Sequence, residues 1–522
     1  MYIKKIVKIE NFRNLTGLAF TFDDEVNFIV GESNTGKTNL IEMLNKLFFT
    51  ASFEKSDFCD PARPIRITYT IGYEAIEKGL LKNSLKEANN DQGQLMIKAV
   101  QEGPDQDIVY TNASTNQVIA AEKVKRLNYL YHSAVKSAKE LSLSDLEAQS
   151  YKGFTRGLRA YLEENDIDLH KVCDGIQFTV NICIKILKYI YDLKRELANM
   201  EQCLVKTPEG ICYLPFILAL DEPEIHNHPY RQRALIKSII KIMNNKNKGF
   251  LKLLKGYFGI DGLNGQIFVV THSPNILLNN YKQIVRVYRS ANGVKVVSGS
   301  RLRFAMDTHK HLVRSFIYFK EAMFSNAIIL VEGDTEFGAV PVFARRLGID
   351  LDKEGVGLVK LDGADGVLRF LSLFNAFKID AIAILDRDKK SSYGDRKEIY
   401  FTRARDFEEE LYDLFSFRQL LKYLATINRH SFLSYYLGMA IKGFNSDAFT
   451  DAPLEYKLPD HATKNIMAII KKAALEELRD NKNVINGALM ATYVDQLPKS
   501  FVEVITRAVN KHRSQPGPGG DY

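Results

Sequence analysis

A short apolar segment that runs directly into a glycine-containing loop constrains the fold of this chain more than any other feature. Residues 26–30, VNFIV, have the pattern of a buried strand, and residues 31–38, GESNTGKT, match the pattern GxxxxGK followed by serine or threonine. In such a strand, loop and helix unit, backbone amides and the helix N-terminus bind phosphate groups, so Gly31 and Gly36 are candidate nucleotide-binding residues. The sequence therefore predicts an α/β domain with a nucleotide site.

Five side chains have the chemistry that ATP and Mg²⁺ require. Lys37 is expected to reach the β and γ phosphates, and Thr38 to ligate Mg²⁺. The segment YLPFILALDEPE ends a buried strand in two carboxylates: Asp221 is expected at the Mg²⁺, directly or through water, and Glu222 as the general base. His272 follows another buried strand, where its imidazole can contact the γ phosphate. These residues predict ATP binding and hydrolysis.

A further segment, VCDGIQFTVNICIKIL, places Asp174 and Gly175 just before a long helical pattern. Asp174 can simply cap that helix. Alternatively, a glycine at the start of a helix presents amides to the γ phosphate of a partner subunit, as in ABC-type ATPases. No sustained heptad pattern fills the stretch between Gly36 and Asp174, so long coiled-coil arms are not expected.

The segments NFRN, GESNTGKTNLIE, LDEPE and VVTHS resemble the RecF and SMC-like branch of the ABC ATPases. In that branch, nucleotide is bound between two heads, so the resemblance implies a homodimer or a higher even homo-oligomer. It also marks Asn34 as a nucleotide-binding residue, together with Asp174 and Gly175. The chain departs from the branch where CDGIQ replaces the usual serine and paired glycines, which affects the geometry of the amide donors.

A second set of carboxylates lies in the later segments AIILVEGDTE and KIDAIAILDRDKK, separated by alternating helical and strand patterns. This alternation predicts a small parallel sheet with acidic residues at the carboxyl ends of its strands. Glu332 ends the first strand, Glu336 follows it, and Asp386 and Asp388 end a strand expected to be its neighbour. Four ionised carboxylates need cations to neutralise them, so the sequence predicts Mg²⁺ or Mn²⁺ at this edge.

This second constellation resembles a Toprim domain, and an ATPase head followed by Toprim resembles the OLD family of nucleases, named for overcoming lysogenisation defect. The resemblance implies an ATP-regulated, divalent-metal-dependent endonuclease that cuts or nicks DNA, with RNA not excluded. It also implies antiphage defence with a possible defence-system partner. By the same likeness, Glu332 and Asp386 are catalytic, Glu408 is a further metal ligand, and Lys482 assists cleavage. From the residues alone, Glu408 is equally one of three solvated helix glutamates, and Lys482 an ordinary loop lysine.

Two other classes of function compete with a nuclease. A nucleotide-driven clamp or sensor would bind nucleic acid without cutting, but the intact Glu332, Asp386 and Asp388 argue against it. A topoisomerase or primase lacks support, because there is no zinc-ligand cluster and no nucleophile stands out among 25 tyrosines. The segment 387–405 is rich in basic residues that would hold backbone phosphates next to the acidic site. These residues are Arg387, Lys389, Lys390, Arg396, Lys397, Arg403 and Arg405.

The length and composition of the sequence limit how the chain can be organised. Its 522 residues allow two or three domains: an ATPase head at 1–318, Toprim at 319–425, a helical region at 426–510 and a flexible tail at 511–522. The net charge of +8 permits a polyanion partner. Five cysteines without a CxxC pair favour a reducing cytoplasm, and no apolar run reaches the roughly 18 residues that span a bilayer. A cytoplasmic protein without membrane partners is expected.

Overall fold

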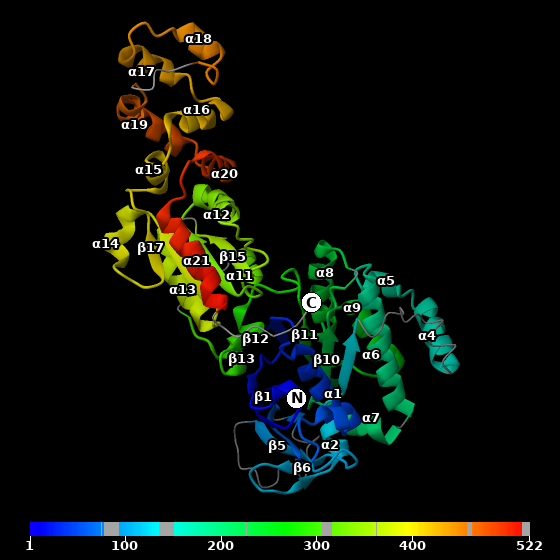
Figure 1. Ribbon diagram of the computed structural model, residues 1–522. Coiled ribbons are helices and arrows are strands. Elements are labelled where there is room, and N and C mark those ends of the chain that lie inside the picture. Colours follow the sequence, from blue (N-terminus) through cyan, green and yellow to red (C-terminus); the bar gives the residue numbers. More distant parts are fainter. Residues whose placement is uncertain are drawn as a thin grey trace. The chain divides into compact units, whose positions relative to one another are not determined.

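The computed structural model describes residues 1–74, 76–77, 93–134, 151–195, 197–225, 227–304, 316–361, 363–456 and 462–513. The chain divides into two compact units, Met1–Arg303 and Phe304–Tyr522 (Figure 1). Most of the tail expected at 511–522 lies outside the described residues. The domain boundaries at 318, 425 and 510 stay predictions.

The first unit contains two sheets. One has the strand order β2-β1-β4-β5-β6-β7 and is antiparallel. The other has the order β13-β12-β3-β11-β10-β8, with β9 beside β10, and its strands β12, β3, β11, β10 and β8 are parallel. The strands are β1 (Tyr2–Glu10), β2 (Phe20–Thr21), β3 (Val26–Gly31), β4 (Ile65–Gly72), β5 (Gln94–Gln101), β6 (Val109–Asn112), β7 (Val118–Ile119), β8 (Tyr129–Ser133), β9 (Val205–Lys206), β10 (Cys212–Asp221), β11 (Gly262–Val270), β12 (Ile284–Ser290) and β13 (Gly293–Ser298).

Helix α1 joins both sheets into one apolar core. Its Leu40 and Ile41 are buried in the same cluster as Ile67 of the first sheet and Phe268 of the second. Helix α6 packs against β8 and α8. The helices of this unit are η1 (Arg13–Leu15), α1 (Lys37–Asn45), η2 (Lys46–Thr50), η3 (Lys55–Asp57), α2 (Ala121–Lys125), α4 (Lys152–Glu164), α5 (Leu169–Val172), α6 (Gln177–Arg195), α7 (Leu197–Cys203), α8 (Pro229–Met243), α9 (Lys248–Leu253), η5 (Leu254–Phe258), η6 (Tyr281–Gln283) and η7 (Gly299–Arg301).

The second unit is built on a four-stranded parallel sheet of order β15-β14-β16-β17. Its strands are β14 (Ala327–Val331), β15 (Val356–Lys360), β16 (Asp380–Leu385) and β17 (Ile399–Phe401). Every residue of β14 is buried, as its continuous apolar pattern predicts for a central parallel strand. Val331 pairs in register with Ile384, so β14 and β16 end side by side. The predicted small parallel sheet is confirmed.

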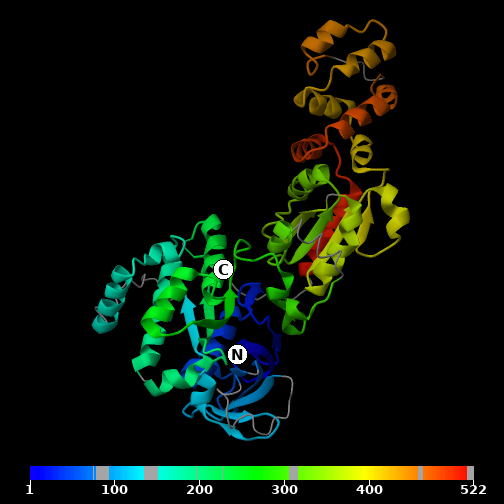
Figure 2. The ribbon, with the colours of Figure 1, turned by 180° about the vertical axis from the view of Figure 1, so that it is seen from behind.

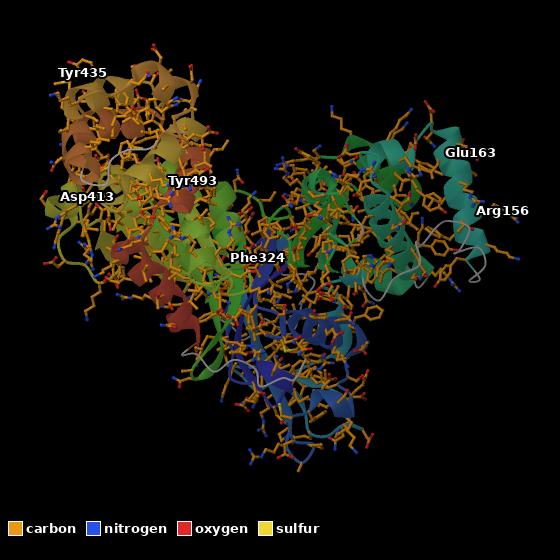
Figure 3. All side chains as sticks on the ribbon, turned by 45° about the horizontal axis from the view of Figure 1, so that its top comes forward. Arg156, Glu163, Phe324, Asp413, Tyr435 and Tyr493 are labelled. Atoms are coloured by element: carbon orange, nitrogen blue, oxygen red, sulfur yellow. The ribbon has the colours of Figure 1, made fainter. Side chains whose placement is uncertain are left out.

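Helices complete the second unit and return to its sheet. The last helix, α21, packs against β14 and β16, and both ribbon views show it running across the sheet (Figures 1 and 2). Helix α20 packs along α12 and ends at Tyr493, which is labelled in Figure 3. The helices are α11 (Phe316–Ala322), α12 (Asp334–Arg346), η8 (Ala364–Gly366), α13 (Val367–Ala376), η9 (Arg387–Lys389), α14 (Lys390–Tyr393), α15 (Phe407–Tyr412), α16 (Phe417–Thr426), α17 (Phe432–Ala440), α18 (Ser446–Asp451), α19 (Ala462–Asp480), α20 (Val484–Tyr493) and α21 (Lys499–Arg513).

The predicted α/β fold, with a helical C-terminal region, is confirmed. In the part of the chain that the structure describes, no helix combines the length and the apolar character that crossing a membrane requires.

Candidate functional site

The end of β3 and the loop that follows it have positive φ angles, a backbone conformation that glycine and asparagine adopt more readily than other residues. Gly31 has a φ of 130° and Gly36 a φ of 94°. A Cβ atom at Gly31 would lie 1.8 Å from the carbonyl oxygen of Val287, and one at Gly36 would lie 2.5 Å from Oδ1 of Asn14. Asn34 also adopts a positive φ, 58°, which asparagine accepts more readily than most residues. The loop therefore turns tightly into the N-terminus of α1, as a phosphate-binding loop must.

Lys37 is held across this loop. Its Nζ donates hydrogen bonds to the carbonyl oxygens of Gly31, at 3.0 Å, and Glu32, at 2.6 Å. Burial lowers the pKa of the Lys37 ammonium to about 8, while the nearby carboxylates of Glu222, Glu32 and Asp221 oppose that shift. A phosphate group beside the ammonium would favour its charged form further.

Asp221 at the end of β10 is held by two hydroxyl groups. Thr38 Oγ1 donates to its Oδ1 at 3.2 Å, and the Tyr131 hydroxyl donates to its Oδ2 at 3.3 Å. Burial raises the pKa of the Asp221 carboxyl. The two expected Mg²⁺ ligands, Thr38 and Asp221, are thus hydrogen-bonded to each other. Tyr131, which the sequence analysis missed, also contacts Asp221. The strand-like pattern YLYHS could have indicated β8, but not its pairing beside β10.

Glu222 and His272 meet at the ends of β10 and β11. Glu222 has a positive φ of 51°, a strained conformation common at functional sites. Its Oε1 lies 3.6 Å from Nε2 of His272. Burial lowers the pKa of the His272 imidazole, the Lys37 charge lowers it further, and Glu222 acts in the opposite direction. The histidine is therefore favoured in its neutral form beside the predicted general base.

Glu224, another residue that sequence reasoning missed, connects these two strand ends. Its Oε1 accepts hydrogen bonds from the backbone N–H of His272, at 2.7 Å, and from Thr271 Oγ1, at 2.9 Å. Burial raises the pKa of the Glu224 carboxyl, and these hydrogen bonds oppose the shift. The second glutamate of the DEPE segment was the available signal.

Asp174 and Gly175 form the turn between α5 and α6. Both have a positive φ, 55° and 69°. Oδ2 of Asp174 lies 3.8 Å from Nζ of Lys241 on α8, and the Gly175 amide donates to the carbonyl oxygen of His170 at 2.7 Å. These contacts place the turn against α5 and α8, and the contribution of its amides to a second subunit stays a prediction.

The second site lies where β14 and β16 end. The backbone N–H of Asp386 donates to Oε2 of Glu332 at 3.2 Å, which joins the two strand ends directly. The amide of Phe407, at the start of α15, donates to Oδ1 of Asp386 at 2.9 Å. Glu336 projects from the first turn of α12 and is 7% exposed. The sequence-predicted Glu332, Glu336 and Asp386 therefore share one edge of the sheet.

Glu408 and Lys482 complete this acidic cluster. Glu408 is fully buried, which excludes the alternative of a solvated helix glutamate. Nζ of Lys482 lies 2.8 Å from its Oε2, while its Oε1 has no hydrogen-bond partner among the described residues. Lys482 also interacts electrostatically with Glu336 and Asp386. It is therefore placed at the acidic cluster, unlike an ordinary loop lysine.

Asp388 is positioned differently from the other predicted ligands. It lies in η9, with a side chain that is 43% exposed and an Oδ2 3.5 Å from Nζ of Lys389. Its amide donates to the carbonyl oxygen of Arg405. These contacts are with the basic segment, where Arg403 pairs with Glu503 at 3.3 Å. No described contact joins Asp388 to the acidic cluster, and its role as a metal ligand stays a prediction.

Burial and mutual repulsion perturb the carboxyl groups of the cluster. Burial raises the pKa of Glu336 to about 7, with a further contribution from Glu408. It raises the pKa of Asp386 to about 8, with contributions from Glu336, Glu332 and Glu408, against the opposing charge of Lys482. A bound cation would favour the ionised forms of both groups.

The donor set fits a hard divalent cation. All four groups are carboxylates, the ligands that Mg²⁺ and Mn²⁺ prefer, and the buried Oε1 of Glu408 has no competing protein partner in the described structure. Nevertheless, among the described residues, no three acidic, histidine or cysteine side chains already converge closely enough to hold an ion. Metal binding would therefore require these carboxylates to draw together.

These perturbed groups predict a pH-dependent stability of the metal-free protein. Each carboxyl holds its proton more tightly when folded than unfolded, because its pKa is raised from an ordinary 4.5 for Glu336 and 3.8 for Asp386. The contribution of these raised pKa values to the free energy of unfolding is fully present below pH 4 and is lost as the pH rises through about 7 to 8. We expect the melting temperature in EDTA to fall by several degrees between pH 5 and pH 8.

Two comparisons test the cause of that loss. At pH 8, Mg²⁺ or Mn²⁺ should restore part of the melting temperature, because a cation stabilises the ionised carboxylates. Glu336→Gln, which cannot ionise, should show a flatter pH profile in EDTA than the parent chain. An identical profile in both proteins would contradict the assignment.

Two sequence families match this chain. The family described as overcoming lysogenization defect protein-like, TOPRIM domain, matches residues 323–388. The family described as AAA ATPase domain matches residues 1–162 and 81–277. The first match contains the strand ends that carry Glu332 and Asp386, and the second contains the loop with Lys37 and the strand end with Asp221.

Individual relatives match parts of the chain. The Old nuclease of Escherichia phage P2 is 21% identical over 228 residues, 42% of this chain and 34% of that protein. The DNA replication and repair protein RecF of Francisella tularensis subsp. novicida is 32% identical over 93 residues, 17% of this chain and 26% of that protein. A solved structure, the C-terminal region of the Burkholderia pseudomallei OLD protein, is 14% identical, with a TM-score of 0.22, over 36% of this chain and 99% of that one. This chain thus spans about a third or less of the length of these two curated relatives.

Proposed function

Since this chain belongs to the OLD family, in which an ATPase domain is joined to a Toprim domain, we propose that it is a divalent-metal-dependent endonuclease that cuts or nicks DNA under the control of ATP. The observation that carries the proposal is the acidic cluster at the ends of β14 and β16. Four carboxylates and one lysine gather there on elements that are far apart in the sequence. They are Glu332, Glu336, Asp386, Glu408 and Lys482.

The cluster provides the groups that phosphodiester hydrolysis needs. Glu332, Asp386 and Glu408, with Glu336, would hold Mg²⁺ or Mn²⁺, and a bound divalent ion supplies a polarised phosphate and an activated water. The Lys482 ammonium would lie beside the phosphate and stabilise the negative charge that develops during cleavage. The basic segment 387–405 would hold flanking backbone phosphates without reading sequence, so RNA stays an alternative substrate.

Incubation of the purified protein with supercoiled DNA, linear DNA and RNA tests the proposal directly. Each substrate is combined with Mg²⁺ or Mn²⁺, with and without ATP, and the products are separated on gels. We expect nicked or linear DNA. Relaxed closed circles would instead indicate a topoisomerase, and unchanged nucleic acid under every condition would favour the clamp or sensor. A protein with Glu332→Ala, purified in parallel, controls for contaminating nucleases.

We further propose that the first unit binds ATP with Mg²⁺ and hydrolyses it. Lys37 and Thr38 would bind the phosphates and the ion, Asp221 would hold the ion, and Glu222 would accept a proton from the attacking water. His272 would contact the γ phosphate. A second copy of the chain would supply the Asp174–Gly175 turn to the same nucleotide, so a homodimer or a higher even assembly is expected.

The contacts of Glu224 predict its effect on this reaction. Glu224→Ala removes the acceptor that holds Thr271 and the His272 backbone, so the imidazole loses its fixed position beside Glu222. We expect kcat for ATP hydrolysis to fall roughly tenfold, the effect of one hydrogen bond to a charged group, with little change in KM. Phosphate release measures both constants. Glu224→Gln keeps an acceptor oxygen and should retain most of the activity; equal losses in both variants would contradict the positioning role.

The family also supports a proposal at the level of the cell. An OLD family chain that cuts DNA in response to nucleotide would act in antiphage defence, alone or with a second component of a defence system. Phage plating on bacteria that express the parent chain or the Glu332→Ala variant tests this role. Equal plating on both would contradict it.

A further inference from the structure

Lys482 lies in the short loop between α19 and α20, and an ion pair fixes α19 just before that loop. Arg479 donates from Nε and Nη2 to Oδ2 of Asp406, at 3.0 and 2.7 Å. The other oxygen of Asp406 accepts from the amide of Glu409 at 2.9 Å and so caps α15, the helix that carries Glu408. One aspartate therefore connects the helix of the buried carboxylate to the segment of the lysine.

A close backbone contact fixes the other side of the loop. A Cβ at Gly338 of α12 would lie 1.9 Å from the carbonyl oxygen of Val484, and a Cβ at Gly487 of α20 would lie 2.0 Å from that of Thr335. The two glycines thus let α12 and α20 approach backbone to backbone. Because Glu336 lies between Thr335 and Gly338, this contact brings the start of α20 to the turn that carries the carboxylate.

Hydrogen bonds within the loop also restrict its path. The Asn483 side chain accepts from the amide of Asn486 at 2.8 Å and caps α20. Nδ2 of Asn486 donates to the carbonyl oxygen of Asn481 at 2.7 Å, and Nδ2 of Asn481 donates to that of Glu477 at 2.8 Å. The backbone on both sides of Lys482 is therefore fixed, and the direction of its side chain depends on where α19 ends.

We propose that Arg479 is a positioning residue for the nuclease reaction: its ion pair with Asp406 sets the end of α19 so that Nζ of Lys482 faces Glu408. This inference rests on the proposed nuclease function. Arg479 suits the role because two N–H groups of its planar guanidinium donate to the same oxygen, Oδ2 of Asp406, which restricts direction as well as distance. It touches none of the four carboxylates of the cluster through any described contact, so it acts through Lys482.

A double-mutant cycle distinguishes positioning from general stabilisation. We expect Arg479→Ala to lower kcat for DNA cleavage roughly tenfold, as loss of an orienting partner typically does, with KM for DNA nearly unchanged. In a Lys482→Ala background, the same change should cost nothing further, because the group that Arg479 orients is gone. Multiplied losses in the double variant would overturn the proposal. Arg479→Lys, which can keep one hydrogen bond, should recover part of the rate.

Lys471 offers a matched control on the same helix. It pairs with Glu409 at 3.1 Å and Asp413 at 2.9 Å, so Lys471→Ala also breaks a contact between α19 and α15, but more than two turns before Arg479. We expect Lys471→Ala to leave kcat unchanged. A loss equal to that of Arg479→Ala would mean that any weakening of the α19 contact lowers activity, and would overturn the specific role of Arg479.

A measurement without substrate or metal keeps this inference separate from the proposed function. The Lys482 side chain is 45% exposed, so an amine-reactive reagent can reach it while its ion pair with Glu408 slows the reaction. Labelling with acetic anhydride in EDTA, read by mass spectrometry, should be faster at Lys482 in Arg479→Ala than in the parent, with the exposed Lys397 as internal reference. Unchanged labelling would overturn the inference. If the parent chain cuts no nucleic acid, the nuclease proposal fails, and the labelling result still decides whether Arg479 orients Lys482.

Discussion

Replacing Glu332 or Asp386 with alanine should abolish cleavage of nucleic acid in both Mg²⁺ and Mn²⁺. The two residues follow adjacent parallel strands, and the Asp386 amide donates to Glu332. Each replacement therefore removes a carboxylate from the centre of the acidic cluster. We expect a loss of at least about a thousandfold, as when a principal group that stabilises charge in a transition state is removed. The rate of ATP hydrolysis should stay within a few fold, because the nucleotide residues belong to the other unit. Nicking of supercoiled DNA and release of phosphate measure the two activities.

Asp388→Ala is the matched control for this prediction. It removes a carboxylate two residues from Asp386, but one that is 43% exposed and paired with Lys389. We expect a smaller loss of cleavage than for Asp386→Ala, and partial recovery in Mn²⁺, which accepts imperfect ligand sets better than Mg²⁺. Equal losses would show that Asp388 joins the site when substrate and metal bind. Full cleavage by Glu332→Ala and Asp386→Ala would place the nuclease elsewhere.

The difference between Asp386 and Asp388 shows where sequence reasoning about this site stops. Two aspartates at the end of a strand look equivalent in a sequence, and both were predicted as ligands. In the structure, Asp386 still has an extended backbone, with a φ of −64° and a ψ of 143°, while Asp388 is the second residue of η9. That turn carries its side chain toward Lys389. Which of the two aspartates lies at the acidic cluster depends on where a 3₁₀ helix starts, and the spacing of residues in the sequence does not determine that start.

Glu408 shows the converse case, in which a tertiary contact selects one residue from a run. The segment FEEEL offers three glutamates at successive positions, and the sequence left open whether any is buried. Asp406 caps α15 through the amide of Glu409 and so fixes the phase of the helix. As a result, Glu408 is buried beside Lys482 and Glu410 is buried beside Ser500, whereas Glu409 pairs with Lys471 at 3.1 Å. The phase could have been inferred from the cap, but the contact of Glu408 with Lys482, in the loop after α19, could not.

The fold could be predicted from the sequence more completely than the site could. The predicted α/β fold, an ATPase head followed by a Toprim sheet and helices, is confirmed, because a strand, loop and helix unit and a βαβ pattern are local features. The contact of Tyr131 could not be predicted, because it depends on the pairing of strands that are distant in the sequence. Its strand, β8, enters the second sheet beside β10 from a position about 90 residues earlier in the chain, and only that pairing brings its hydroxyl to Asp221.

At the nucleotide site, Lys37→Ala should abolish ATP hydrolysis by removing a phosphate contact, whereas Glu222→Gln should bind ATP and leave it uncut. The two variants differ because Lys37 lies within the loop and Glu222 lies at the strand end beside His272. A glutamine has the size of the glutamate but cannot accept the proton of the attacking water. Nucleotide binding and phosphate release, measured on the same preparations, separate the two defects. Hydrolysis by Glu222→Gln at the parent rate would remove Glu222 from the role of general base.

Glu222→Gln also tests how nucleotide controls cleavage, because it prolongs the ATP-bound state. If two copies of the chain bind one nucleotide between Lys37 of the first and the Asp174–Gly175 turn of the second, ATP should shift the mass in light scattering to that of a dimer or a higher even assembly. We expect DNA cleavage by this variant to fall as ATP rises, because the residues of the acidic cluster all come from the second unit and need no group from the first. Lys37→Ala, which should neither assemble nor respond, is the matched control. A monomer at micromolar concentration that cuts DNA equally well at every ATP concentration would contradict both the assembly and the coupling.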